Sequence, residues 1–200
     1  MRRRRGSAVA DDAAVIESSW REPERFAVLF DRHAPHIYRY LARRAGRQVA
    51  DDLVAETFLA AFAKRDRYDL GHADARPWLY GIATNLVGQH RRDEARQYRI
   101  RQAAAAEPGV PGHAERVAAD VTAQAMRPLL DAALAELPSG DRDVLLLIAW
   151  EQLTYQEVSR ALAIPVGTVR SRLHRARTKV RQVLAGTDAA ATYEEITTSE

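Results

Sequence analysis

The stretch Pro165–Arg177 reads PVGTVRSRLHRAR and carries five basic side chains, counting His174, and no acidic one. A helix of this composition suits a solvated surface, a membrane surface or a groove of DNA. The charge of the chain favours DNA. The formal net charge is only +3, yet Val169–Arg181 alone holds six arginines and lysines, which leaves −3 for the remainder. Such a concentrated basic stripe is the electrostatic footprint of a nucleic-acid-binding surface.

The helical phase of this stretch supports the same interpretation. At about 100° per residue, the apolar side chains fall on one stripe facing a domain core: Val169, Leu173, Ala176, Val180 and Val183. The outward face carries Ser171, His174, Arg175 and Thr178, flanked by Arg170, Arg177 and Arg181 on one side and by Arg172 and Lys179 on the other. A membrane-surface helix would need a broad apolar face. A solvated face would mix acids with bases, whereas Ala161–Gly186 contains no acid.

The residues before this stretch complete a helix-turn-helix. TYQE places Thr154 and Glu157 at the spacing of a capping box, which predicts a helix from there to about Leu162. AIP then makes a short turn, and a short helix, a tight turn and a longer helix are typical of DNA-binding modules. Upstream, a helix that begins after Ser139 is predicted to bury Val144, Leu145 and Ile148.

The first half of the chain also has helical apolar periodicity. One helix, kinked or split at Pro35, is predicted to bury Phe26, Leu29, Phe30, Ile37 and Leu41. A second helix is predicted over residues 51–64. A third is predicted over residues 74–96, with Asp74 as its cap and Pro77 in its first turn. The predicted apolar face of the third helix is Trp78 or Leu79, Ile82 and Leu86.

These patterns predict an all-α protein with two small helical domains joined by a flexible linker, the C-terminal domain containing the helix-turn-helix. The domains are expected over residues 22–96 and 127–185. Segment 97–126 contains EPGVPG and few large apolar residues, which is typical of a linker. Residues 1–21 and 186–200 are expected to be disordered tails, the first basic and the second acidic.

Several classes of function are disfavoured. The chain has no cysteine, so it has neither disulfides nor thiolate metal sites. Its start lacks the apolar core of a signal peptide, and no apolar run approaches the length of a membrane span, so a cytoplasmic protein without a membrane partner is expected. His33 and His36 have a spacing that could suggest a metal, but Pro35 spoils the helical geometry between them. We expect no catalytic residue, no metal and no cofactor.

Three motifs in series resemble the bacterial RNA polymerase sigma factors of the extracytoplasmic function (ECF) group. LTYQEVSRALAIPVGTVRSRLHRARTKVR resembles their C-terminal DNA-binding module, ADDLVAETFLAAF their clamp-binding helix, and RPWLYGIATNLVGQHRR their promoter-melting helix. The family usually has Gln where Ala55 stands and Gly at the turn position held by Ala163. If that turn is left-handed, Ala costs about 1 kcal/mol relative to Gly.

The resemblance implies a transcription initiation factor without catalytic activity. Its partners would be core RNA polymerase, through the clamp of the large subunit and the flap, and promoter DNA, both duplex and melted; an anti-sigma factor is a further implied partner. The implied minus-thirty-five contacts are Thr168, Arg170, Ser171, Arg172, His174 and Arg175. The implied minus-ten contacts are Asp69, Gly71, His72, Arg76 and Asn85. The implied polymerase contacts are Asp52, Leu53, Glu56 and Thr57.

The contacts are expected to differ in what they read. An arginine fork can pair bidentately with guanine or clamp a phosphate. Arg175 and Ser171 lie at the outward centre of the helix and are expected to touch bases. The basic residues toward the end of the helix are expected to touch phosphates, which position a protein without specifying sequence. They are Arg177, Lys179 and Arg181. The polar loop 69–76 suits a base flipped out of the stack.

Two other functions stay open on the sequence alone. A stand-alone dimeric helix-turn-helix regulator would explain the second segment, but it leaves DDLVAETF and PWLYGIATN without a role. A symmetric operator with half-sites about 34 Å apart would favour it. An all-helical enzyme or metal protein using the histidines is the third class, and metal analysis of the purified protein would reveal it.

Overall fold

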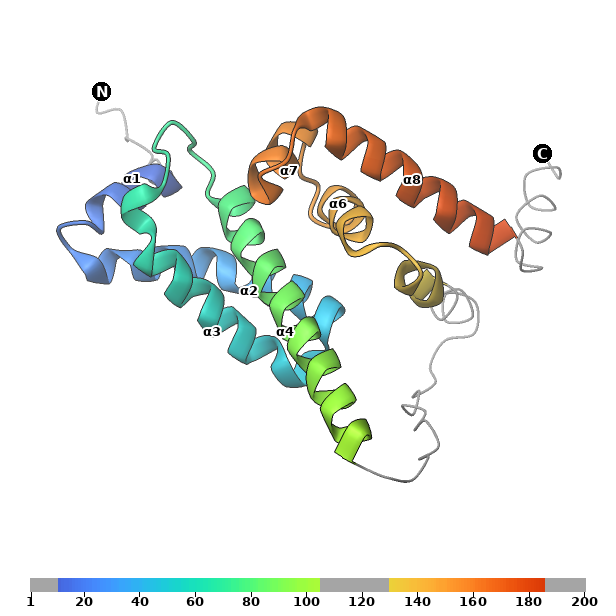
Figure 1. Cartoon of the computed structure of the whole chain (residues 1–200). Helices are drawn as coiled ribbons and strands as arrows, with labels where there is room; N and C mark the ends of the chain where they lie inside the picture. Colours follow the sequence, from blue (N-terminus) through green and yellow to red (C-terminus); the bar gives the residue numbers. More distant parts are fainter. Residues whose placement is uncertain (1–10, 105–129, 186–200) are drawn as a thin grey trace, which may run out of the picture. The chain divides into compact units, whose positions relative to one another are not determined.

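The computed structural model describes residues 11–104 and 130–185, and Figure 1 shows that these ranges are helical. The N-terminal unit, built on residues 11–96, contains α1 (Asp12–Ser18), η1 (Pro23–Phe26), α2 (Ala27–Ala45), α3 (Arg47–Ala63), η2 (Arg65–Arg67) and α4 (Arg76–Ala104). The rest of the described chain forms a helical segment at 130–135, α6 (Ser139–Ala149), α7 (Tyr155–Leu162) and α8 (Val166–Ala185), of which α6 and α8 belong to the C-terminal unit. The predicted all-α class is confirmed. No helix in the described ranges combines the length and the apolar character needed to cross a bilayer.

The core of the N-terminal unit is formed by α2, α3 and α4. Gly46 joins α2 to α3 with a φ of 90°, a backbone conformation that glycine adopts without steric cost. Tyr40 of α2 packs edge to face on Tyr80 of α4, with ring centroids 5.3 Å apart. The Tyr40 hydroxyl also hydrogen-bonds Thr84 Oγ1 at 2.7 Å, so its polar end is satisfied inside the core. Together these contacts fix α4 against α2.

The predicted core face of the first long helix is correct except at one residue. Leu29, Ile37 and Leu41 are buried, and so is Phe26 in the 3-10 turn just before α2. Phe30 is 45% exposed instead, with its ring packed edge to face on Phe58 of α3. The chain continues as one helix through Pro35.

On α4, the buried face includes Leu79, one of the two predicted alternatives, and is displaced by one position from the other predicted residues. Ile82 and Leu86 are half-buried, whereas the fully buried side chains are Leu79, Tyr80, Ala83 and Val87. The helix also continues beyond Arg96 to Ala104, into the predicted linker. The rest of that segment, and the predicted tail 186–200, lie outside the described residues.

Residues 12–18 correct the expectation that the first 21 residues form a disordered tail. They form α1, capped by the Asp11 side chain, which accepts a hydrogen bond from Ala14 N at 2.8 Å. Val15 and Ile16 are buried. A seven-residue helix is too short to be stable alone, so α1 depends on these contacts with the rest of the unit.

In the C-terminal unit, α6 and α8 pack on each other and α7 precedes α8 across a tight turn. Val169, Leu173 and Ala176 of α8 are buried, as predicted; Val180 and Val183 are half-buried. On α6 the buried apolar residues are Val144, Leu146 and Leu147, whereas Leu145 and Ile148, predicted to be buried, are half-buried.

The capping box that begins α7 is confirmed. Glu157 Oε2 accepts hydrogen bonds from Thr154 N at 2.7 Å and from Thr154 Oγ1 at 2.8 Å, and Glu157 N donates to Thr154 Oγ1 at 3.3 Å. The turn after α7 has Ala163 at φ 51°, so this turn is left-handed at a position where alanine is less favourable than glycine. Gln152, before α7, also has a positive φ of 56°.

Candidate functional site

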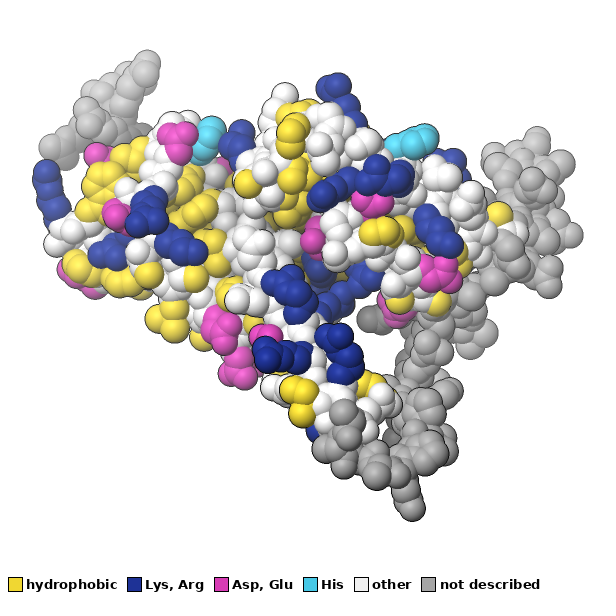
Figure 2. Space-filling view, in the orientation of Figure 1, with side chains coloured by type: hydrophobic (Ala, Val, Ile, Leu, Met, Phe, Trp, Pro, Cys, Tyr) yellow, Lys and Arg dark blue, Asp and Glu magenta, His cyan; other side chains and the backbone are white. Residues whose placement is uncertain are grey.

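The outward face of α8 is available to a ligand. Arg170, Ser171 and His174 are exposed, whereas Thr168 and Arg172 are half-buried. Lysine and arginine side chains gather over this helix in Figure 2, with a histidine among them. No ion pair is formed within the described residues by the flanking arginines Arg170, Arg177 and Arg181, so their full positive charge faces solvent.

Arg175 is different, because its guanidinium is paired within the unit. Nε donates to Asp141 Oδ2 at 2.9 Å and Nη2 donates to Asp141 Oδ1 at 2.8 Å. The Asp141 side chain is 7% exposed and the Arg175 side chain is 58% exposed. These hydrogen bonds raise the pKa of Arg175 further above its usual value. This pair could not be predicted from the sequence, because the two residues are 34 positions apart.

Two further basic residues of α8 reach back toward the start of α6. Lys179 Nζ lies 2.9 Å from Glu136 Oε2, in a half-exposed ion pair. The Arg172 guanidinium lies over Gly140, so closely that a Cβ at residue 140 would stand 2.6 Å from Arg172 Nη1. Lys179 and Arg175 therefore have acidic neighbours that reduce their net attraction for phosphate, which the sequence did not indicate.

In the N-terminal unit, the loop 69–76 is held by its own hydrogen bonds. Asp69 Oδ1 accepts from Gly71 N at 2.9 Å, and the Asp69 carbonyl accepts from His72 N at 3.1 Å. The Tyr68 hydroxyl donates to the His72 carbonyl at 2.6 Å. Burial raises the pKa of that hydroxyl, and the Asp12 and Asp74 carboxylates add to the effect. Asp69 thus shapes the turn, while Gly71 lies exposed at its tip.

The end of this loop is anchored to α1 through Asp12. Asp12 N donates to the Ala73 carbonyl at 3.0 Å, and Asp12 Oδ2 accepts from Ala75 N at 2.9 Å. The same carboxylate is bonded to His33 Nε2 at 2.8 Å and to Arg32, both on α2. Burial alone would raise the pKa of Asp12, but the hydrogen bonds from His33 and Ala75 outweigh it and hold this pKa below its usual 3.8.

The remaining minus-ten candidates lie on α4, Arg76 at its first position and Asn85 nine residues further along the helix. Arg76 N donates to Asp74 Oδ1 at 2.8 Å, so Asp74 satisfies the first helical amide, although the helix begins at Arg76 and the predicted cap lies one residue before the N-cap position, Ala75. Trp78 packs on Tyr68 with ring centroids 5.0 Å apart, which makes it a support for the loop. Arg76 is half-buried, and Asn85 is exposed on the same helix. An exposed side-chain amide can hydrogen-bond the edge of an unpaired base.

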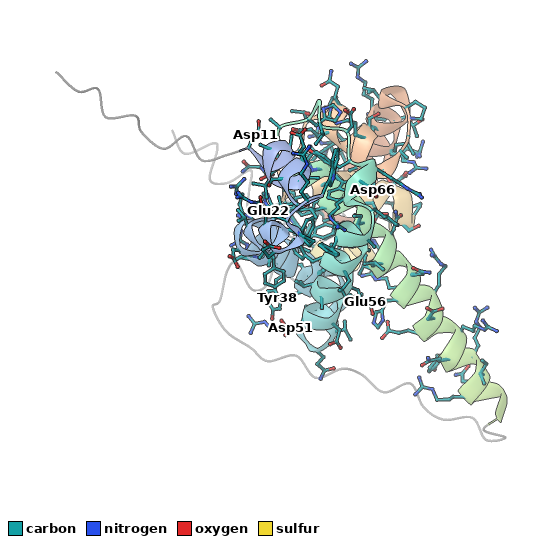
Figure 3. The ribbon with its side chains drawn as sticks, turned by 90° about the vertical axis from the view of Figure 1, so that its left-hand side faces the viewer. Asp11, Glu22, Tyr38, Asp51, Glu56 and Asp66 are labelled. Atoms are coloured by element: carbon teal, nitrogen blue, oxygen red, sulfur yellow. The ribbon has the colours of Figure 1, made fainter. Side chains whose placement is uncertain are left out.

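On α3, only part of the predicted polymerase-binding set is accessible. Leu53 and Thr57 are buried, and Thr57 Oγ1 donates to the Leu53 carbonyl at 2.6 Å. This corrects the expectation that their side chains form a contact surface. The exposed stripe of α3, two residues of which are labelled in Figure 3, consists of Asp51, Asp52, Ala55, Glu56 and Leu59. Leu59 is 69% exposed and was missed, although its spacing from Asp52 and Glu56 places it on the same helical face.

His33 and His36, which were considered and rejected as metal ligands, have hydrogen-bonding partners within the protein. His33 bonds to Asp12, and His36 Nδ1 lies 2.8 Å from Arg39 Nη2. Within residues 11–104 and 130–185, no three His, Cys, Asp or Glu side chains are grouped so that they could hold a metal ion.

Comparisons with known proteins match both units. The family described as "Sigma-70 region 2" matches residues 29–97, and "Sigma-70, region 4" matches residues 127–180. The chain is 36% identical over 190 residues to the ECF RNA polymerase sigma factor SigE of Mycolicibacterium smegmatis, covering 89% of this chain and 65% of that protein. It is 34% identical over 163 residues to the RNA polymerase sigma factor CarQ of Myxococcus xanthus, covering 80% of this chain and 90% of that protein.

Two solved structures resemble the fold. CnrH, in complex with the cytosolic domain of CnrY, has a TM-score of 0.60 and 25% identity, covering 88% of this chain and 97% of that one. The sigma factor RpoE from Bartonella quintana, in complex with the anti-sigma factor NepR, has a TM-score of 0.59 at 21% identity, covering 80% of this chain and 96% of that one. The second likeness concerns the fold alone.

Proposed function

Because the chain belongs to the ECF RNA polymerase sigma factors of the sigma-70 family, we propose that it binds core RNA polymerase, directs it to specific promoters and assists promoter melting. One observation carries the proposal: region 2 and region 4 occur in the family order in one chain, and the region 4 match ends in an acid-free basic helix. A stand-alone helix-turn-helix regulator would leave the region 2 unit unexplained.

Region 4 would read the minus-thirty-five element through α8. Exposed Arg170, Ser171 and His174 lie on the outward face, where a major groove can receive a helix. Arg177 and Arg181 lie beside that face and would contact phosphates, which fix the position of the helix on the duplex. Each phosphate contact releases counterions, so binding through these arginines would weaken as salt rises.

Region 2 would act on the minus-ten element after its strands separate. The loop 69–76 is braced by Asp69, Tyr68 and Asp12, so it offers a fixed surface against which an unstacked base can be held. Asn85 is exposed on α4 and would hydrogen-bond a base edge that pairing hides. Holding unpaired bases stabilises the open state over the duplex.

The exposed stripe of α3 would dock on the clamp of the polymerase. It combines acids, Asp52 and Glu56, with the apolar Leu59. A large exposed apolar side chain with charges beside it is the composition of a binding patch whose centre is desolvated by a partner. Leu53 and Thr57 would support this face by burying the inner side of α3 in the core.

An anti-sigma factor is part of the proposal. The structures of RpoE and CnrH that resemble this chain are complexes with NepR and with the cytosolic domain of CnrY. A protein that occupies the α3 stripe or the outward face of α8 would block the polymerase or the promoter, and would thereby hold this factor inactive.

Run-off transcription with core RNA polymerase tests the function. The templates are a promoter library with both upstream and downstream elements randomised, and the RNA is sequenced. We expect transcripts from a defined subset of templates only when core polymerase and this protein are both present, with each component alone as control. We expect the protein alone to bind these promoters weakly, since two small modules gain affinity when a third body fixes their spacing.

Two results would contradict the proposal. One is a transcript pattern that is unchanged by adding the protein to core polymerase. The other is tight binding of a symmetric site by the purified protein as a dimer, which would favour the stand-alone regulator.

A further inference from the structure

We propose that Asp141 is a positioning residue for promoter readout: its carboxylate holds the Arg175 guanidinium so that the outer edge of the fork can pair with a guanine. The inference rests on the proposed function, since it concerns how α8 would read the upstream element. It concerns a residue of α6, which lies outside α8, the helix proposed to enter the DNA groove.

The geometry leaves the base-reading edge of the guanidinium open. The pair with Asp141 uses Nε and one hydrogen of Nη2. Of the five N–H donors of arginine, three remain: both hydrogens of Nη1 and the second hydrogen of Nη2. No partner of Nη1 occurs among the residues that the structure describes. One Nη1 hydrogen and one Nη2 hydrogen form the end of the fork, which matches O6 and N7 of guanine.

The two side chains of this pair differ strongly in burial. Asp141 is almost fully buried at the first turn of α6, while Arg175 projects from α8 with more than half of its side chain exposed. The acid thus lies inside and the arginine outside, next to the exposed Ser171 and His174. An arginine held in this way has already lost rotamer freedom that DNA binding would otherwise remove.

The charge of the pair separates its role from that of a phosphate contact. Asp141 offsets the charge of Arg175, so the pair attracts phosphate less than an unpaired arginine does. Its remaining value lies in directed hydrogen bonds, which specify a base. The exposed arginines at 170, 177 and 181 have no such acid among the described residues and suit the phosphates.

The test is selection of duplex DNA by the complete complex of core polymerase with this protein. The upstream element is randomised, the downstream element is fixed to one that the unmodified protein uses, and bound DNA is sequenced. We expect the unmodified protein to enrich guanine at one position. Arg175→Ala should lose that preference by about 5- to 150-fold, the range for a bidentate pair. Asp141→Asn should lose it at the same position by at least about fivefold.

The matched control is Glu136→Gln. It also removes one negative charge that faces α8, since Glu136 pairs with Lys179. Both variants should raise binding of all sequences slightly, but only Asp141→Asn should lose the guanine preference. The double variant of Asp141→Asn with Arg175→Ala should lose no more than Arg175→Ala alone. Arg175→Lys keeps a cation beside the buried carboxylate but lacks the fork, so it should lose the preference without unfolding the unit.

Three outcomes would overturn the inference. If Asp141→Asn keeps or sharpens the guanine preference, the acid restrains Arg175 and competes with DNA. If Asp141→Asn weakens all sequences evenly, Asp141 has only a structural role. If Arg175→Lys or Arg175→Ala leaves the preference intact, Arg175 does not read a base. Failure of the unmodified protein to select any sequence with core polymerase is a different result, and it would count against the proposed function itself.

Discussion

Asp12 makes the stability of the N-terminal unit sensitive to acid. Its pKa is held below 3.8 in the folded protein, so the ionised carboxylate stabilises the fold at neutral pH, and this contribution is lost as pH falls through the folded pKa. Asp12→Asn should lower the free energy of unfolding by about 1–3 kcal/mol at pH 7, because it removes charge-assisted hydrogen bonds to Arg32 and His33. It should also flatten the fall in stability between about pH 5 and pH 2. Urea unfolding at several pH values measures both effects.

The neighbouring residue supplies the control for this prediction. Asp11 is exposed and caps α1 through Oδ1, a bond that an asparagine can also accept. Asp11→Asn should therefore change neither the stability at pH 7 nor its acid dependence by more than a few tenths of a kcal/mol. An Asp12→Asn protein with the acid dependence of the unmodified one would show that the carboxylate does not ionise differently on folding.

For single residues, the sequence predicts which face of a helix is buried better than it predicts which residue a side chain bonds to. The period of α8 placed Val169, Leu173 and Ala176 in the core, because burial of an apolar stripe follows from helical geometry. The partners of Asp12 and Arg175 could not be predicted, since each pair joins positions 20 to 63 residues apart. The resemblance implies a surface role for Leu53 and Thr57, whereas their helical phase, about 100° around the helix from Asp52 and Glu56, turns them into the core.

Among the elements, the turn between α7 and α8 carries a strained residue. Ala163 has a φ of 51°, where a Cβ is disfavoured. Ala163→Gly should stabilise the C-terminal unit by up to about 1 kcal/mol, the cost of the left-handed conformation less the greater entropy of glycine in the unfolded chain. Hydrogen exchange of the α8 amides in the full chain should slow by up to about fivefold. Gln182→Gly, at an exposed interior position of α8, should instead speed it. Equal effects of the two substitutions would show that the turn is not strained.

The element that escaped prediction is α1. Its seven residues contain only two large buried apolar side chains, Val15 and Ile16, which is too short a pattern to show a period. Much of what fixes α1 comes from the loop after Tyr68 and from α2, through Asp12. The long helices α2, α3, α4 and α8 were predicted because each repeats its apolar face over several turns.

For the whole molecule, the proposed order of events separates polymerase binding from strand opening. Asn85→Ala should leave binding to core polymerase intact, since Asn85 lies on α4, away from the α3 stripe in sequence and exposed to solvent. It should reduce open-complex formation, measured as permanganate reactivity of promoter thymines. On a template already unpaired by mismatches at the minus-ten element, a melting defect should largely vanish, whereas a base-reading defect should persist. Normal opening of the paired promoter by Asn85→Ala would remove this residue from the proposed site.

The anchoring of the loop 69–76 by Asp12 has a consequence for how the protein is made on the ribosome. Asp12 leaves the exit tunnel early, but Ala75, whose amide it accepts, follows 63 residues later. At synthesis rates of about 5–20 residues per second, α1 therefore waits roughly 3 to 13 s for its final partners. During that interval Val15 and Ile16 have only part of their packing, and the helix is too short to persist by itself. Among the described helices of this unit, α1 is thus translated first and is among the last to settle.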